Sequence, residues 1–192
     1  MSKGILPYHT VDSQGSTKEK IITTTITLCA KKNYHQTSLD EIAEACDIRK
    51  ASIFHHFNTK LDLIIDVIKT IQNDCQAFIF DPVMNATENR ANLIVLFKKL
   101  TCDYIQKRKD INIPACITFA DSQDSPKLKQ TIKTFYDIWI QQASNCFDKI
   151  QTKKDSSELS KHLITLLTGH AFLQQASIKF KPTFLDTFFD NL

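Results

Sequence analysis

The chain has 192 residues, enough for one ordinary domain or for a small domain fused to a medium one. A hydrophobic fraction of 42% and a charged fraction of 23% are typical of globular proteins, and a formal net charge of +3 permits nucleic-acid binding without requiring it. The 3 glycines, Gly4, Gly15 and Gly169, exclude the clustered glycines of phosphate-binding loops and argue against a fold rich in hairpins. The composition therefore favours an all-α protein.

The cysteines and histidines carry no obvious metal or redox motif. Adjacent His55 and His56 would diverge by about 100° on a helix, so neither a metal site nor a cofactor is expected. The absence of Cys-x-x-Cys pairs indicates buried, reduced thiols and a cytoplasmic protein. No signal peptide or membrane span is expected, because the longest apolar run is Leu93–Phe97. The 6 cysteines are Cys29, Cys46, Cys75, Cys102, Cys116 and Cys146.

The first element in chain order follows a flexible tail expected over residues 1–15. Ser16 and Glu19 have the spacing of a capping box, which predicts a helix that Asn33 would close. The β-branched run Ile21–Thr27 also fits a strand, so the periodicity leaves that alternative open.

Two short helices are expected next. A second capping box, Ser38 with Glu41, opens a helix that ends near Cys46, and another helix follows over about 49–57. The small Ala43 would let the two helices approach, Asp47 tolerates the positive φ of the turn between them, and Ile48 and Ile53 would pack the pair. This spacing is that of a helix-turn-helix, whose second helix enters the major groove of DNA.

The run TSLDEIAEACDIRKASIFHHFNTKLDLI resembles the DNA-binding domain of the tetracycline-repressor (TetR) family, and TKEKIITTTITLCAKKNY is similar to the first helix of that domain. The resemblance covers about residues 17–65. It implies that Thr37 contacts a phosphate and that Lys50, Phe54, His56 and Lys60 face the DNA backbone or bases. With the other residues of the motif, the candidate DNA contacts are Thr37, Ser38, Arg49, Lys50, Ala51, Phe54, His55, His56 and Lys60.

Three departures from the family pattern fall in the helix-turn-helix motif, and two more, Cys29 and Asn33, fall at positions where a large aromatic residue and a glycine are common. Asp47 stands where glycine is usual, and Phe54 replaces a tyrosine that would donate a hydrogen bond to phosphate. Arg49 stands where Ser or Thr usually caps the second helix, which costs about 1 kcal/mol but adds a guanidinium that can read a base.

Helical signals continue to the C-terminus. A long helix is expected from Leu61 to a stop at Asp81–Pro82, and another carries the stripe of Leu93, Phe97 and Tyr104. Ser125 and Pro126 start a helix that runs to Ile150, and Asp155 and Glu158 start one that runs to Lys181, with a last helix after Pro182. We therefore expect nine to ten helices, with a helix-turn-helix domain over 16–60 (motif 38–57) and an effector-binding and dimerisation bundle over 61–192.

The resemblance implies a ligand-responsive transcriptional regulator, most simply a repressor, that binds a palindromic double-stranded operator as a homodimer. An effector would pivot the helix over residues 61–80 and change the separation of the two recognition helices. Aromatic side chains in the bundle favour an apolar or aromatic small-molecule effector. The candidate pocket residues are Phe97, Tyr104, Cys116, Phe119, Tyr136, Trp139 and His170, and the candidate dimer interface is formed by Leu163, Leu167, Gly169 and Ala171.

Other interpretations remain open from the sequence. Cys116 could serve a thiol-based sensor of electrophiles or redox state instead of lining a wall or the core. A DNA-binding module without a sensor would be more basic and less aromatic. A helical enzyme would need polar groups on the apolar faces, where they are sparse, so no enzymatic activity is expected.

Overall fold

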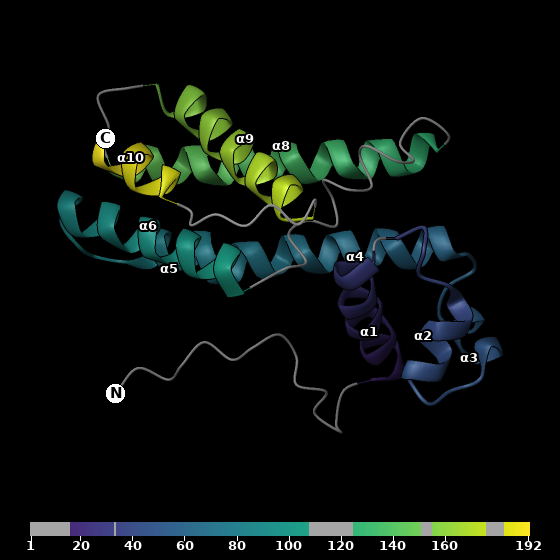
Figure 1. The fold of residues 1–192 in the computed structure, drawn as a ribbon. Coiled ribbons are helices and arrows are strands. Elements are labelled where there is room, and N and C mark those ends of the chain that lie inside the picture. The colour runs from purple at the N-terminus through teal and green to yellow at the C-terminus, as the bar shows by residue number, and fades with distance from the viewer. Residues whose placement is uncertain (1–15, 33, 108–124, 151–154, 176–182) are drawn as a thin grey trace.

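The computed structural model describes residues 16–32, 34–107, 125–150, 155–175 and 183–192, and these ranges contain helices and no strand. Three helices at the N-terminal end form a compact head: α1 (Thr17–Lys32), α2 (Leu39–Ala45) and α3 (Lys50–Phe54). The head lies against one end of α4 (Lys60–Cys75), and the remaining helices form a body around the rest of α4 and its continuation (Figure 1). The all-α expectation is confirmed.

The first segment is a helix despite its β-branched run. The Ser16 backbone N–H donates to Glu19 at 2.8 Å, as the capping box predicted. Within the helix, the hydroxyls of Thr23, Thr25 and Thr27 donate to carbonyls one turn earlier, at 3.0, 2.7 and 3.0 Å. These bonds satisfy the threonine hydroxyls inside a helix, and the strand alternative is therefore wrong. Asn33 lies outside the described residues.

The helix expected to stop at Asp81–Pro82 instead continues past it. A π-helical turn, η1 (Gln76–Phe80), follows α4 directly and leads into α5 (Asp81–Asn85), with helical backbone angles at Gln76 and Asp81. Pro82 lies in the first turn of α5, where a missing N–H is tolerated. The expected stop is therefore corrected to a change of helix type.

The body adds α6 (Arg90–Lys107), α8 (Pro126–Ile150), α9 (Ser156–Gln175) and α10 (Phe184–Asp190). The caps predicted for α8 and α9 are present: Ser125 Oγ accepts from the Leu128 N–H at 3.3 Å, and Asp155 accepts from the N–H groups of Ser157 and Glu158. With α4, η1 and α5 taken as one rod, the described residues form eight helices, slightly fewer than expected.

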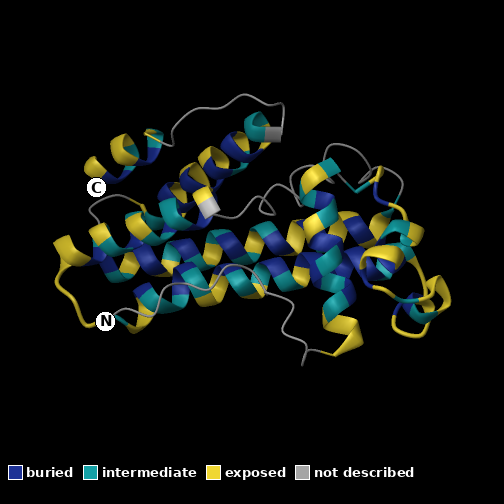
Figure 2. Ribbon diagram, turned by 60° about the horizontal axis from the view of Figure 1, so that its bottom comes forward, coloured by how far each residue is buried: buried dark blue, intermediate teal, exposed yellow. Residues whose placement is uncertain are grey.

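The core of the body is built around aromatic rings. Phe97 on α6 is fully buried, and its ring centroid lies 6.3 Å from Phe80, 5.3 Å from Phe147 and 5.4 Å from Phe189. Buried residues line the facing sides of the long helices, whereas exposed residues follow their outer sides (Figure 2). α9 packs across α8 (Figure 1). Within the described ranges, no helix combines the length and apolar character needed to cross a lipid bilayer.

Candidate nucleic-acid interface

The turn between α2 and α3 has the geometry that the sequence predicted. The Ser38–Glu41 capping box is complete, and α2 ends at Ala45 with Cys46 as its C-cap. Asp47 has a φ of 53°, a left-handed conformation that non-glycine residues rarely adopt. The Ile48 N–H donates to the Ala43 carbonyl at 3.0 Å, which closes the turn, and Ala43 and Ile53 are buried between the helices. The motif is therefore a helix-turn-helix.

The second helix of the motif is shorter than expected. α3 ends at Phe54 rather than near Phe57, although the N–H groups of His56 and Phe57 still donate to the Ile53 carbonyl at 3.0 and 2.9 Å. Phe57 turns inward and is buried, with the Lys18 ammonium 5.3 Å from its ring centroid. Burying Phe57 redirects the chain toward the Thr59 cap of α4, so α3 stops early.

The outer surface of α3 presents most of the predicted DNA contacts. Arg49 is the N-cap of α3 and makes no side-chain capping bond, as its replacement of Ser or Thr predicted. Phe54 is 47% exposed, so its ring is open to a partner. The predicted contacts that are exposed are Ser38, Arg49, Lys50, Ala51, Phe54, His55 and His56.

Two lysines of the candidate interface are already engaged within the head. Lys50 Nζ lies 2.8 Å from Asp40 Oδ2 on α2. Lys60 Nζ donates to the Tyr34 carbonyl at 2.8 Å and lies 4.2 Å from the centroid of the Tyr34 ring. Lys50 has a charged partner, so DNA would compete with Asp40 for it.

Thr37 differs from the other candidates because its side chain is fully buried. It hydrogen-bonds with the Cys29 thiol, whose pKa is raised by burial. The phosphate contact implied for Thr37 is therefore not open to its side chain in this arrangement. Thr37 instead joins the α1 core to the start of α2.

The acidic residues of α2 are neutralised locally. Glu41 pairs with Lys32 on α1 and also accepts from the Ser38 backbone N–H, and these hydrogen bonds lower the pKa of Glu41 to about 2. Asp40 has Lys50 as its partner. Asp40 and Glu41 thus have internal partners and oppose a nearby polyanion less than two free carboxylates would.

The described residues that were predicted to line a pocket are all buried in the body except Tyr136, which is half-buried. Phe97 and Trp139 are core residues, and Trp139 packs on Phe135 with ring centroids 4.8 Å apart. Tyr104 is buried, and its hydroxyl accepts from Cys75 Sγ at 2.8 Å. His170 is buried 5.3 Å from the Phe184 ring, and burial lowers the pKa of its imidazole. Cys116 and Phe119 lie outside the described residues.

Tyr136 borders a hollow that opens outward between α8 and α9. Its volume is about 520 Å³. Most of the residues that line it were not predicted from the sequence. The signal that could have found them is that α9 is apolar on more than one face. The lining residues are Tyr136, Ile140, Lys161, Ile164, Thr165, Thr168, Gly169 and Phe172.

The predicted dimer interface is divided by the fold. Leu163, Leu167 and Ala171 are buried inside the subunit, so they cover its own core and their assignment to an outer surface is corrected. Gly169 is exposed and lines the hollow. The face of α9 that points outward instead carries Leu166 and Phe172, which are 37% and 44% exposed.

An N-terminal helix-turn-helix on an all-helical body defines a DNA-binding transcriptional regulator. Residues 21–67 match the model of the bacterial regulatory proteins of the tetR family, and this match supports a TetR-family transcriptional regulator. It is 26% identical over 143 residues to IcaR of Staphylococcus aureus (strain Newman), a negative transcriptional regulator of the biofilm operon icaADBC, covering 63% of this chain and 77% of IcaR. It is 35% identical over 72 residues to IcaR of Staphylococcus epidermidis, or 38% of this chain and 37% of that protein.

Solved structures share the fold over nearly the whole chain. A TetR transcriptional regulator from Legionella pneumophila superposes with a TM-score of 0.75 at 23% identity, covering 92% of this chain and 95% of that one. FadR from Bacillus subtilis, solved in complex with stearoyl-CoA, superposes with a TM-score of 0.70 at 14% identity, covering 90% and 95%. AibR, solved with isovaleryl coenzyme A and operator DNA, gives 0.66 at 15% identity, covering 92% and 95%.

Proposed function

We propose that this protein is a homodimeric repressor that acts in the cytoplasm, binds a palindromic operator through α3, and is released from DNA by a small-molecule effector. The observation that carries the proposal is the exposed surface of α3, the second helix of the helix-turn-helix, where the side chains of Arg49, Lys50 and Phe54 are exposed. The assignment as a repressor is supported by IcaR, a negative regulator. The proteins named in the comparisons are regulators, which supports a non-enzymatic role.

Selection of bound fragments from a random pool of double-stranded DNA tests this function. We expect enrichment of a palindrome whose half-sites are about one helical turn, ~34–36 Å, apart. Affinity for it should fall steeply with salt, and Lys50→Ala should weaken it. Failure to enrich any sequence, or an affinity that is independent of salt, would contradict DNA binding by this surface.

The dimer proposal is supported by Gly169, because nothing within the subunit requires a glycine at this position. Gly169 lies inside α9, where glycine costs about 1 kcal/mol relative to alanine. Its φ is not positive, and an added Cβ would have nothing within 4 Å. Close approach of a second copy over the hollow explains the residue, because exposed Leu166 and Phe172 flank it with apolar surface.

Gly169→Leu should therefore shift sedimentation from dimer toward monomer without unfolding the subunit. Lys99→Leu, which adds the same side chain to an exposed position on α6, serves as the control and should leave the assembly unchanged. A wild-type protein that is monomeric at micromolar concentration would contradict the dimer, as would an equal response of the two variants.

The proposed effector is apolar or aromatic and binds within the body. FadR and AibR have been solved with acyl-CoA molecules, which supports effector binding on this fold. Trp139 is the only tryptophan in the chain, so its emission reports on the body alone. In a screen of acyl-CoA esters and small aromatic compounds, a cognate ligand should change that emission and weaken DNA binding together. Operator DNA should weaken the ligand by the same factor.

The thiol-based alternative is tested with Cys116→Ser. Burial raises the pKa of the Cys29, Cys102 and Cys146 thiols, which disfavours the reactive thiolate at these positions. If the Cys116→Ser protein still releases DNA with the ligand, the effector acts without that thiol. If instead an electrophile such as N-ethylmaleimide releases the wild type but not the variant, the thiol is the sensor.

A further inference from the structure

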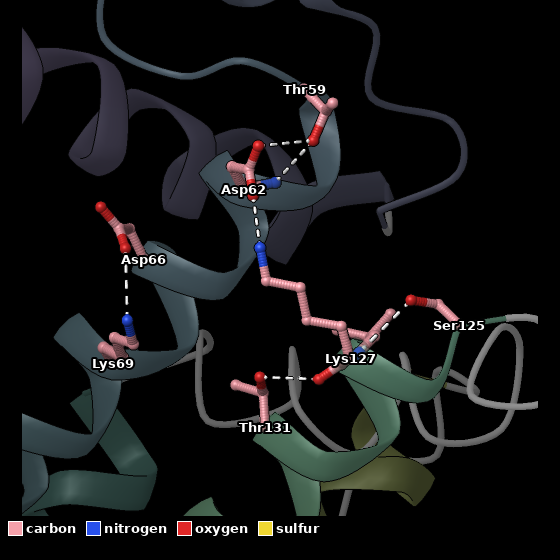
Figure 3. A network of polar contacts seen from close by, with 8 residues as sticks. Thr59, Asp62, Asp66, Lys69, Ser125, Lys127 and Thr131 are labelled. Atoms are coloured by element: carbon pink, nitrogen blue, oxygen red, sulfur yellow. Dashed lines mark hydrogen bonds and ion pairs between the residues drawn. The ribbon is translucent and has the colours of Figure 1, made fainter.

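α4 carries two aspartates one turn apart that pair with lysines from opposite parts of the molecule. Asp66 accepts from Lys18 on α1 at 2.8 Å, which joins α4 to the head. Asp62 accepts from Lys127 on α8 at 2.7 Å, which joins the start of α4 to the start of a body helix (Figure 3). One helical segment is therefore bonded to the DNA-binding side and to the body side.

The Asp62 carboxylate is held in place more firmly than a typical surface acid. Its Oδ2 accepts from the Thr59 hydroxyl at 2.9 Å, while the Asp62 N–H donates to that hydroxyl at 3.0 Å, so the residue closes the cap of α4 (Figure 3). The other oxygen, Oδ1, faces Lys127. The Asp62 side chain is 29% exposed, against 57% for Asp137 in a pair within α8. Because the cap fixes the Asp62 carboxylate relative to α4, the ion pair with Lys127 constrains the position of α8 relative to α4.

Lys127 occupies a place that the helix itself disfavours. It lies in the first turn of α8, directly after the Ser125 cap and Pro126, and that turn has no acidic residue. A positive charge at a helix N-terminus opposes the helix dipole. The dipole therefore does not favour Lys127 at this position, whereas the ion pair with Asp62 on α4 does.

We propose that Asp62 and Lys127 are positioning residues that set the orientation of the DNA-binding head on the body, and hence the separation of the two recognition helices in the dimer. The start of α4 moves with the head, because Lys60 binds the Tyr34 carbonyl and Asp66 binds Lys18. The Asp62–Lys127 pair ties that same turn to α8. The inference rests on the proposed function, since orientation matters only to a protein that spans two half-sites.

The test compares Lys127→Met with Lys133→Met. Lys133 also lies on α8 and pairs with an aspartate, Asp137, but within the same helix, so the two variants lose the same charge and one ion pair each. Each full-length protein is titrated against the selected operator and against versions with one base pair added or removed between the half-sites. Lys127→Met should bind the selected operator about fivefold more weakly, because two copies of a partly exposed pair are lost, and should discriminate less between spacings. Lys133→Met should match the wild type in both.

Further variants separate positioning from charge and from folding. Lys127→Arg keeps the pair and should restore spacing discrimination. Asp62→Asn keeps an oxygen for the Thr59 cap but loses the ion pair, so it should reproduce Lys127→Met, and the double variant should be no worse than either. All melting temperatures should stay close to that of the wild type, because the pair is partly exposed.

Two outcomes would overturn the inference: equal effects of Lys127→Met and Lys133→Met, or unchanged discrimination between spacings in Lys127→Met. Either result leaves DNA binding by the wild type intact and so does not touch the proposed function. If the wild type binds no operator, the proposed function fails first.

Discussion

The head and the body differ in how their informative side chains are placed. In the head, Arg49, Lys50 and Phe54 stay at the surface of a short helix whose caps and turn are local features. In the body, Phe97, Tyr104 and Trp139, which looked equally informative, are buried against other side chains. The exposed residues of a short surface helix can therefore be predicted from local sequence. An aromatic residue in a helical bundle is more often part of the core, so it cannot be assigned to a binding site from sequence alone.

The largest expected effect tests the body side of this contrast. Phe97→Ala removes a ring that touches three others and should lower the free energy of unfolding by about 3–5 kcal/mol. Val95→Ala, on the same helix but at a side chain that is 64% exposed, should change it by less than about 0.5 kcal/mol. Urea unfolding measures both. A loss for Phe97→Ala as small as that for Val95→Ala would mean that Phe97 borders a cavity after all.

The next effect tests the head side. Arg49→Ala should weaken binding to the selected operator by about 1–3 kcal/mol and relax sequence preference at one position. The Arg49 side chain makes no capping bond at the start of α3, so its guanidinium is placed to read a base.

Lys60→Ala should weaken all sequences equally and flatten the plot of log affinity against log salt by about one contact per subunit. Fluorescence anisotropy with operator variants separates them. Uniform weakening by Arg49→Ala would make it a phosphate contact only.

A smaller effect concerns the turn between α2 and α3. Asp47 has a φ of 53°, so Asp47→Gly should relieve the cost of a side chain there and raise the free energy of unfolding by about 1 kcal/mol. Asp47→Ala should lower it, because alanine has no polar group to stabilise the conformation. Thermal melts of the two variants should therefore move in opposite directions. Movement in the same direction would show that the Asp47 side chain contributes through its interactions instead.

The smallest expected effect concerns the pair between Asp40 and Lys50. Asp40→Asn removes an anion 2.8 Å from Lys50 and should strengthen operator binding about twofold to fivefold at low salt, less at high salt. Asp137→Asn, which frees Lys133 in the body, is the matched control and should have no effect. Weaker binding by Asp40→Asn would instead show that Asp40 orients Lys50 for its contact.

Much of the head could be predicted from the sequence because its signals act over a few residues. The capping boxes of Ser16 and Ser38, the left-handed Asp47 and the uncapped Arg49 each depend on neighbours within one turn. The end of α3 was misplaced because Phe57 is drawn into the core from outside the helix. The family resemblance assigned Thr37 to a phosphate, and its burial and its hydrogen bond with Cys29 on α1 could not be seen from the sequence.

The body was predicted less completely because its assignments depend on which face meets which neighbour. The periodicity of α9 shows that more than one face is apolar, but only the packed structure tells that Leu163 and Leu167 turn inward while Leu166 and Phe172 turn outward. The same limit applies to Asp62 and Lys127, whose pairing spans the chain and whose spacing has no periodic signature.

In the proposed mechanism, the unbroken run from α4 through η1 to α5 would act as a lever. From Lys60 to Asn85, at about 1.5 Å per residue, it measures roughly 40 Å. A tilt of about 5° about one end would displace the other by roughly 3 Å, close to the rise between successive base pairs. A rearrangement of the body too small to disturb its aromatic core would therefore suffice to move the head by one step along DNA.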